Sequence, residues 1–282
     1  MANPDPRAVP PVPDAPSAPL PNGRSTRTHL LSNGVVALLL GLGLASAVRL
    51  LAQWVMLAAL GMGDGGLNSV ESLPRLVRDN ALVAGAGPVV GLLLGLAMQV
   101  LQPFRFRGDF AHLLWIWTAC SSLMLAAVPL ACAPFGGDLS VVLVALRLPA
   151  WVGGVAVAAG VAAVLGVAHQ WAIHAVRLCG REVSRLLCFS VYPWLIGTVV
   201  QAAFVLTVVY LDRLDIPRTQ ALVPLLGGAA LTAFAPLSLL FTRRTDELEE
   251  PLLVGRVPWV AVLALVLLAA GFGAARAGLG IA

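Results

Sequence analysis

The sequence predicts an all-α fold, a polytopic transmembrane bundle of about seven helices (six to eight) behind a disordered tail. Of the 282 residues, 59% are hydrophobic and 11% are charged, whereas about 25% are charged in soluble domains. Long uncharged runs recur along the chain, and about 20 such residues cross a hydrocarbon core of about 30 Å. All 18 basic residues are arginine, which is typical of a GC-rich genome. We therefore expect a bacterial inner or plasma membrane protein.

Residues 1–28 are predicted to form a disordered proline-rich tail, and residues 29–282 the transmembrane helical domain. The tail contains eight of the 20 prolines. It lacks the apolar core of a secretion signal, and a chain of this composition buries too little surface to fold.

The predicted spans lie near 30–50, 81–102, 110–133, 148–168, 187–211, 219–241 and 257–275. Most arginines in the connecting segments fall on the side of the membrane that carries the N-terminus. Because arginine accumulates in cytoplasmic loops, we predict a cytoplasmic N-terminus and an extracytoplasmic C-terminus.

The first predicted span carries an arginine close to its end. Leu30 to Val48 is uncharged and nearly long enough to cross the bilayer. The favoured interpretation places Arg49 near an interface, with its guanidinium reaching the headgroups, and lets Leu50 to Met62 continue as an interfacial or bundle-buried helix. In the alternative, one long tilted helix holds Arg49 inside the bundle, where it needs a partner such as Asp138 or Asp64.

Two spans carry small residues at every fourth position, on one helix face. They are Gly87, Gly91 and Gly95 in the second span, and Gly154 with Ala158, or Ala156 with Gly160, in the fourth. Small residues let two helix backbones approach closely. Packing within the bundle is the favoured interpretation, and an oligomer interface is the alternative.

Arg177, Arg181 and Arg185 recur every four residues in HAVRLCGREVSRLL, so one helix would place them on one face, close to His174. Each cation near an anionic leaflet contributes about 1 kcal/mol of attraction. We interpret the stretch as an interfacial helix on the cytoplasmic surface. A docking site for an acidic segment of a partner is the alternative.

Side chains suited to catalysis or metal binding are sparse, and the common catalytic strings do not occur. In HQWAIH, His169 and His174 lie about 140° apart on a helix, so they do not close on one metal ion. Asp138 in APFGGDLS is a candidate intramembrane acid, although an exposed turn is the favoured interpretation. The four cysteines form no C-x-x-C pair and are expected to be small structural residues. We expect no cofactor.

Three segments carry a family resemblance: NSVESLPRLVRDNALVAGAGPVVGLLLGLAM, HLLWIWTACSSLMLAAVPLACAPFGGDLSVVLVALRLPAW and VPWVAVLALVLLAAGFGAARAGLGIA. They resemble, in turn, the short strand region and following helix, the Gly-Asp element with its Leu-Pro turn, and the last helix of intramembrane zinc metallopeptidases of the site-2-protease type. The resemblance covers residues 30–168. It implies that Asp138 takes the position of the third zinc ligand.

The helix that carries H-E-x-x-H in that family reads GLGLASAVRLLAQWVML here, without His or Glu. In the motif, the two histidines bind zinc and the glutamate acts as general base. Because catalytic zinc needs about three protein ligands, the resemblance implies a protease-like fold without protease activity, a pseudoenzyme.

The sequence therefore predicts a multi-pass, non-catalytic membrane protein that scaffolds or regulates partners in the bilayer. The expected partners are membrane lipids and other membrane proteins or a second copy of the chain. Dispersed arginines argue against nucleic acid. Two alternatives stay open: a transporter or channel subunit, and an active metallopeptidase with the unorthodox ligands His112, Asp138 and His169.

Overall fold

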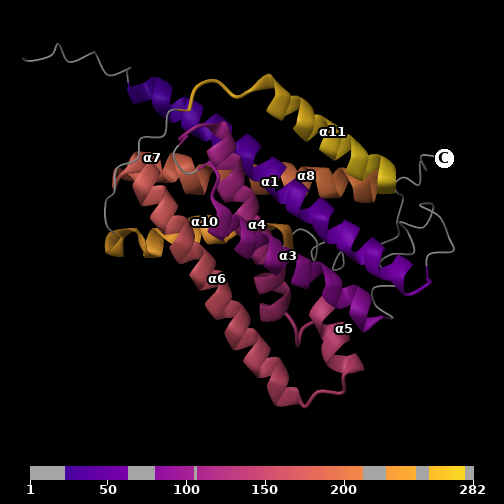
Figure 1. Cartoon of the computed structure of the whole chain (residues 1–282). Helices are drawn as coiled ribbons and strands as arrows, with labels where there is room; N and C mark the ends of the chain where they lie inside the picture. Colours follow the sequence, from indigo (N-terminus) through magenta and orange to yellow (C-terminus); the bar gives the residue numbers. More distant parts are fainter. Residues whose placement is uncertain (1–22, 63–79, 105–106, 212–226, 246–253, 277–282) are drawn as a thin grey trace, which may run out of the picture.

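The computed structural model describes residues 23–62, 80–104, 107–211, 227–245 and 254–276. All regular secondary structure in this part of the chain is helical, and five of its helices are long and apolar enough to cross a membrane. Figure 1 shows these helices crossing one another at various angles. The protein is therefore helical and suited to a membrane, as its composition predicts.

The five long apolar helices coincide with the first five predicted spans. They are α1 (Gly23–Ala59), α3 (Ala81–Leu101), α4 (Phe110–Ala131), α6 (Ala150–Cys179) and the continuous segment formed by α7 (Val183–Leu186), the π-helix η2 (Leu187–Val191) and α8 (Tyr192–Leu211). A short helix, α5 (Asp138–Ala145), lies between α4 and α6.

Helix α1 is the longest element and contacts α3, α4, α8 and α11 (Trp259–Arg276). It begins at Gly23, before the predicted start of the helical domain at residue 29. Residues 1–22 of the predicted tail lie outside the described residues. The helix also continues without interruption past Arg49 to Ala59, beyond the predicted end of the first span near residue 50.

Side-chain caps determine where α3 and α4 begin. The Asn80 side chain accepts hydrogen bonds from the backbone N–H groups of Leu82 and Val83, at 2.9 and 3.4 Å. Asp109 accepts one from the N–H of His112 at 3.1 Å. These caps satisfy amides that have no partner within the helix.

An aromatic core lies where α4, α6, η2 and α10 (Phe234–Leu237) meet. Trp117, Trp171, Phe189 and Phe234 are fully buried there. The ring centroids of the two tryptophans are 4.1 Å apart, and Trp171 stacks on Phe189 at 5.1 Å. Trp171 also donates a hydrogen bond from Nε1 to Oγ of Ser190 at 2.8 Å, which satisfies its polar group inside the core.

The last two predicted spans differ from expectation. Residues 227–241 of the sixth are not one helix, because a turn at Ala233 precedes α10, and the 3₁₀ helix η3 (Ser238–Leu240) follows. Pro236 cannot donate to the carbonyl of Thr232, which explains the interruption. Residues 219–226 lie outside the described part. The seventh is α11, a shorter apolar helix that packs on α1.

Candidate functional site

An arginine and an aspartate meet between the helices of the bundle. Arg49 of α1 donates a hydrogen bond from Nη2 to Oδ2 of Asp138, the first residue of α5. The side chains are 29% and 16% exposed, respectively. Gln53, one turn further along α1, is buried and places Nε2 3.5 Å from the same oxygen. We refer to these three residues as the Arg49–Asp138 cluster.

Two glycines determine the position of Asp138. Gly136 and Gly137 have φ values of 133° and 91°, which residues with side chains rarely adopt. Asp138 follows in the first turn of α5, where the partial positive charge of a helix N-terminus favours a carboxylate. The GGD sequence therefore turns the carboxylate toward α1, and the favoured expectation of an exposed Asp138 is wrong.

Gly87 of α3 leaves room for the arginine. A methyl group at Gly87 would lie 2.8 Å from Cγ of Arg49 and 3.2 Å from its Nε, closer than the usual separation of about 3.5–4.0 Å between packed carbon atoms. This Nε is buried and has no hydrogen-bond partner among the described residues. Gly87 thus allows the side chain to pass between α1 and α3.

The cluster joins α1 and α5 by electrostatics. A charge at the centre of a membrane helix costs about 2.5–3.5 kcal/mol on insertion scales, and each partner reduces this cost for the other. A guanidinium has no lone pair for a metal ion, so Arg49 does not replace a zinc-binding histidine. The geometry matches the long-helix alternative from the sequence, with Asp138 as the partner.

The predicted packing glycines of α3 are buried against neighbouring helices. A methyl group at Gly91 would lie 3.1 Å from the carbonyl oxygen of Ser122, and one at Gly95 would lie 2.6 Å from Cγ of Leu123. Both neighbours belong to α4. Together with Gly87, which lies beside Arg49, these two glycines form a strip on α3 that faces α1 and α4.

The two pairs weighed for α6 lie on different faces. Ala156 and Gly160 are buried, and a methyl group at Gly160 would lie 2.6 Å from Cα of Ala131 in α4. Gly154 and Ala158 are exposed, and a methyl group at Gly154 would meet no described atom within 4 Å. Gly154 and Ala158 therefore face outward, whereas Ala156 and Gly160 pack against α4.

The basic stretch is not one helix, contrary to expectation. Gly180, with φ of 66°, follows the end of α6 and interrupts the helix. Arg177 therefore lies on α6, Arg181 in the connection and Arg185 on α7. Arg181 donates a hydrogen bond to the carbonyl oxygen of Thr245 at 2.8 Å. The three arginines thus come from three local structures.

Glu182, in the same connection, links α7 to the start of α1. Its carboxylate accepts hydrogen bonds from Ser184 and from Arg27 of α1, and Nε of Arg185 lies 3.8 Å away. The bond from Ser184 is the largest cause that lowers the pKa of Glu182 below its ordinary value of 4.5; Arg27 adds to it, and desolvation opposes it. Glu182 therefore favours its charged form.

The described residues contain no group of three or more His, Cys, Asp or Glu side chains placed to hold a metal ion. His112 is buried near the start of α4. His169 is exposed on α6, with its ring centroid 5.4 Å from that of Phe241, and Asp138 pairs with Arg49. The structure does not bring the three unorthodox ligands together.

A small cavity lies where α3 ends and α4 begins. Its volume is about 10 Å³, room for about one water molecule. Gln99, His112 and His174 line it with Trp115, whose Nε1 donates a hydrogen bond to the carbonyl oxygen of Met98 at 2.8 Å. The two histidines, distant in sequence, thus border one cavity.

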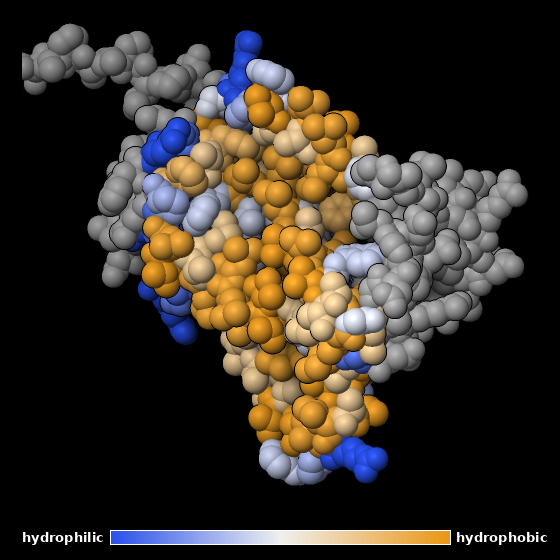
Figure 2. Space-filling model, turned by 45° about the vertical axis from the view of Figure 1, so that its right-hand side comes forward, coloured by the Kyte–Doolittle hydropathy of each residue, from blue (hydrophilic) through white to orange (hydrophobic). Residues whose placement is uncertain are grey.

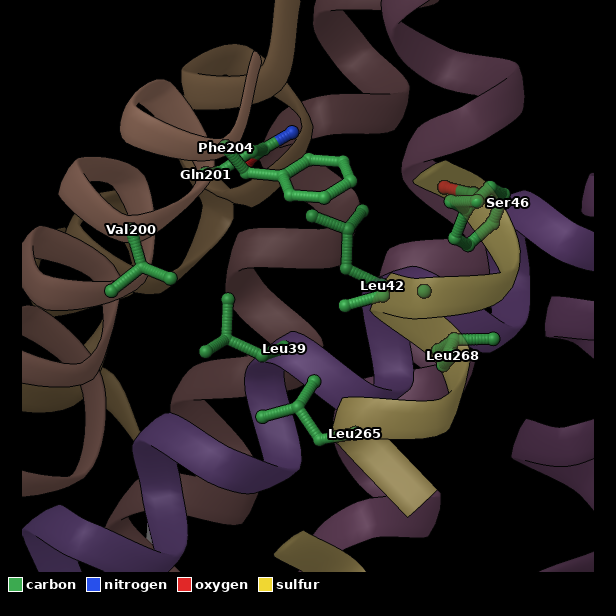
Figure 3. A pocket seen from close by; sticks show the side chains of 11 residues that line it. Leu39, Leu42, Ser46, Val200, Gln201, Phe204, Leu265 and Leu268 are labelled. Atoms are coloured by element: carbon green, nitrogen blue, oxygen red, sulfur yellow. The ribbon is translucent and has the colours of Figure 1, made fainter. Parts of the chain in front are cut away.

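A larger cavity of about 310 Å³ opens where α1, α8 and α11 meet (Figure 3). Leucines of α1 and α11 point into it from one side, and Phe204 of α8 borders the other. Sequence reasoning missed it because helices so far apart in the chain become neighbours only through folding. Its lining includes Leu39, Leu42, Ser46, Gln201, Phe204 and Leu265.

Comparisons of the chain with protein families, with curated proteins and with solved structures find no match. The resemblance to site-2-protease-type metallopeptidases therefore stays a prediction.

Proposed function

We propose that this membrane protein is a non-catalytic subunit that holds or regulates partner membrane proteins through an exposed face of α6. One observation carries the proposal. One series of four small residues, spaced at every fourth position of α6, is exposed, and methyl groups at its two ends, Gly154 and Gly166, would meet no described atom within 4 Å. We name this surface the α6 small-residue face; it consists of Gly154, Ala158, Ala162 and Gly166.

Small residues matter in a membrane because lipid chains are as apolar as leucine. Helices associate there through close packing and interhelical hydrogen bonds, and small residues permit the close approach. The same helix packs against α4 through Ala156 and Gly160. The α6 small-residue face offers a second helix the same kind of contact.

The place of this face in the molecule favours an intermolecular contact. The N-terminal part of α6 extends away from α1 and α8, beside α5 (Figure 1). In Figure 2, apolar residues cover much of the face in view, including most of the narrow lower part of the molecule, whose tip is hydrophilic. Figure 1 places the α5–α6 connection at this end. Trp151, at the start of α6, is 69% exposed. A partner helix could lie along this part of α6 without displacing α1 or α8.

The interior of the bundle supports a structural role. Arg49 and Asp138 neutralise each other, and Gln53 lies beside the same carboxylate. Such a pair holds helices in position. With the missing H-E-x-x-H motif, it is consistent with a protease-like fold that serves as a scaffold.

The test is native mass spectrometry of the full chain released from its own membrane in mild detergent. We expect a heavier species with a defined second protein or a second copy, without zinc. Ala158→Leu should reduce that species by about tenfold, because a larger side chain prevents close approach. Ala163→Leu is the matched control, since Ala163 is exposed on the same helix about 140° away from Ala158.

A lone wild-type protomer would contradict the proposal, and equal losses in the two variants would contradict the role of the α6 small-residue face. A lone protomer carrying one zinc ion would favour the metallopeptidase alternative.

A further inference from the structure

We propose that the cavity between α1, α8 and α11 binds one hydrocarbon chain of a membrane lipid. The cavity volume of about 310 Å³ lies at the lower end of the range of about 300–1,000 Å³ for small-molecule sites. This inference concerns helices other than α6 and goes beyond the proposed scaffold role.

The lining favours an uncharged, flexible, apolar ligand. Leu39 and Leu42 of α1 face Leu265 of α11 and Phe204 of α8 (Figure 3). Among the described residues no charged side chain lines the cavity. A charged headgroup would therefore lose its hydration there without compensation, whereas a hydrocarbon chain would not.

The cavity has the length of part of a lipid chain. On α11 its lining runs from Leu265 to Phe272, and on α1 from Leu39 to Ser46. Each stretch corresponds to roughly 10 Å along a helix axis. The cavity is thus elongated along two helices and matches a chain lying beside them.

The surroundings of the cavity indicate where the chain enters. Phe204 is 39% exposed at the border of the cavity, and the outward residues of α11, such as Leu263 and Val266, are 47% and 58% exposed. These apolar surfaces belong to helices that a bilayer would surround. Lipid chains are therefore the molecules with direct access to the opening.

Water is a poor alternative occupant. Apolar cavities stay dry unless several polar groups can bind the water, and here Ser46 and Gln201 are the polar side chains of the lining. An empty space of this size would leave the surrounding leucines without dispersion contacts on one side. A lipid chain supplies these contacts.

Close packing of α11 on α1 makes the cavity a feature of the fold. Gly43 of α1 contacts Leu268 so closely that a methyl group at this glycine would overlap its side chain. Both residues also line the cavity. The crossing point of the two helices thus forms part of the cavity wall.

The experiment uses the full chain in nanodiscs of phosphatidylcholine that carries a diazirine in one acyl chain. The protein is moved into mild detergent to remove surrounding lipid, and native mass spectrometry counts the lipid retained. We expect about one molecule per protomer. Irradiation should then attach the probe to cavity residues, such as Leu42 and Leu265, at least several-fold more than to outward residues of the same helices.

Two variants of α11 test whether the lipid chain binds inside the cavity. Ala269→Trp fills the cavity, because Ala269 lines it, whereas Ala270→Trp adds the same side chain at the next, exposed residue. We expect the first variant to lose retained lipid by about tenfold and the second to keep it. The wild-type labelling pattern stands even if Ala269→Trp does not fold.

Wild-type protein without retained lipid would overturn the proposal, as would labelling that is equal on inward and outward residues. Equal retention by two folded variants would also overturn it. If a partner helix occupied the cavity instead, the wild-type protein would retain no lipid.

Discussion

The carboxylate of Asp138 and the guanidinium of Arg49 are separated by 89 positions in the chain, yet each makes the other tolerable inside the bundle. An isolated charge would face helices that offer few polar groups. The positions of the two side chains are also fixed by their surroundings. Gly87 has no side chain to obstruct Arg49, and two glycines turn Asp138 inward. Five positions on three helices and one connection therefore depend on one another.

Removing one member of the ion pair should destabilise the protein more than removing both. We expect Asp138→Asn to lower the free energy of unfolding by about 2 kcal/mol, because an uncompensated arginine remains in a part-buried site. The double variant Arg49→Leu/Asp138→Leu should recover most of this loss. Thermal unfolding in detergent, followed by tryptophan fluorescence, measures both. Additive losses in the double variant would show that the two residues are not coupled.

Gly87→Ala tests the space around the arginine. The methyl group would approach Cγ of Arg49 to 2.8 Å, and overpacking of this kind costs about 1–3 kcal/mol. Gly154→Ala is the matched control on an exposed helix face and should be neutral or slightly stabilising, since alanine favours helix. The same unfolding measurement compares them. Equal stability of the two variants would argue against a role of Gly87 in placing Arg49.

Glu182 should make the contact between α1 and α7 depend on pH. Because its pKa is lowered in the folded protein, the carboxylate contributes stability that is present above pH 4.5 and is lost as the pH falls below it. Glu182→Gln should therefore open the start of α1 more easily than wild type at pH 7, and the difference should vanish in acid. Hydrogen exchange of the first turns of α1 measures this opening. A difference that persists unchanged in acid would contradict the role of the charge.

At the scale of elements, the sequence predicts the long helices well and their interruptions poorly. The first five spans follow from uncharged runs of sufficient length, a property of the local chain. The break in the basic stretch depends on the left-handed backbone of Gly180, and the turn at Ala233 depends on Pro236. The spacing of arginines or apolar residues cannot reveal either break. An argument from spacing assumes that the helix is uninterrupted over the whole stretch.

The candidate sites likewise include some that the sequence reveals locally and others that depend on how the helices pack. The sequence identified Arg49, Asp138 and the glycines of α3 as residues of interest, since charge in an apolar run and small residues at every fourth position are local signals. It favoured an interfacial Arg49 over a paired one, because the pairing depends on how α5 packs against α1, which no local pattern reveals. The cavity between α1, α8 and α11 gives no local signal, because leucines line it as they would line any apolar surface.

At the scale of the whole molecule, native cysteines can test the predicted orientation. Cys132, after the end of α4, is exposed, whereas Cys120 and Cys179 are buried and Cys188 is half-buried. With a cytoplasmic N-terminus, the alternation of spans places Cys132 outside the cytoplasm. We expect a membrane-impermeant maleimide to label wild-type protein in intact spheroplasts, and Cys132→Ser to lose most of that label. Labelling only after lysis would indicate the opposite orientation.

The length of α1 makes the protein responsive to the thickness of its membrane. Its apolar portion, Arg27–Ala59, has 33 residues and extends about 50 Å, against a hydrocarbon core of about 30 Å. The excess must be accommodated by tilt, by protrusion or by a thicker surrounding bilayer. Because α3, α4, α8 and α11 pack on this helix, a change in its inclination is transmitted to each of them. Bilayer thickness would thereby affect the arrangement of the whole bundle. In membranes of different lipid composition, α1 and the helices packed on it would be tilted at different angles.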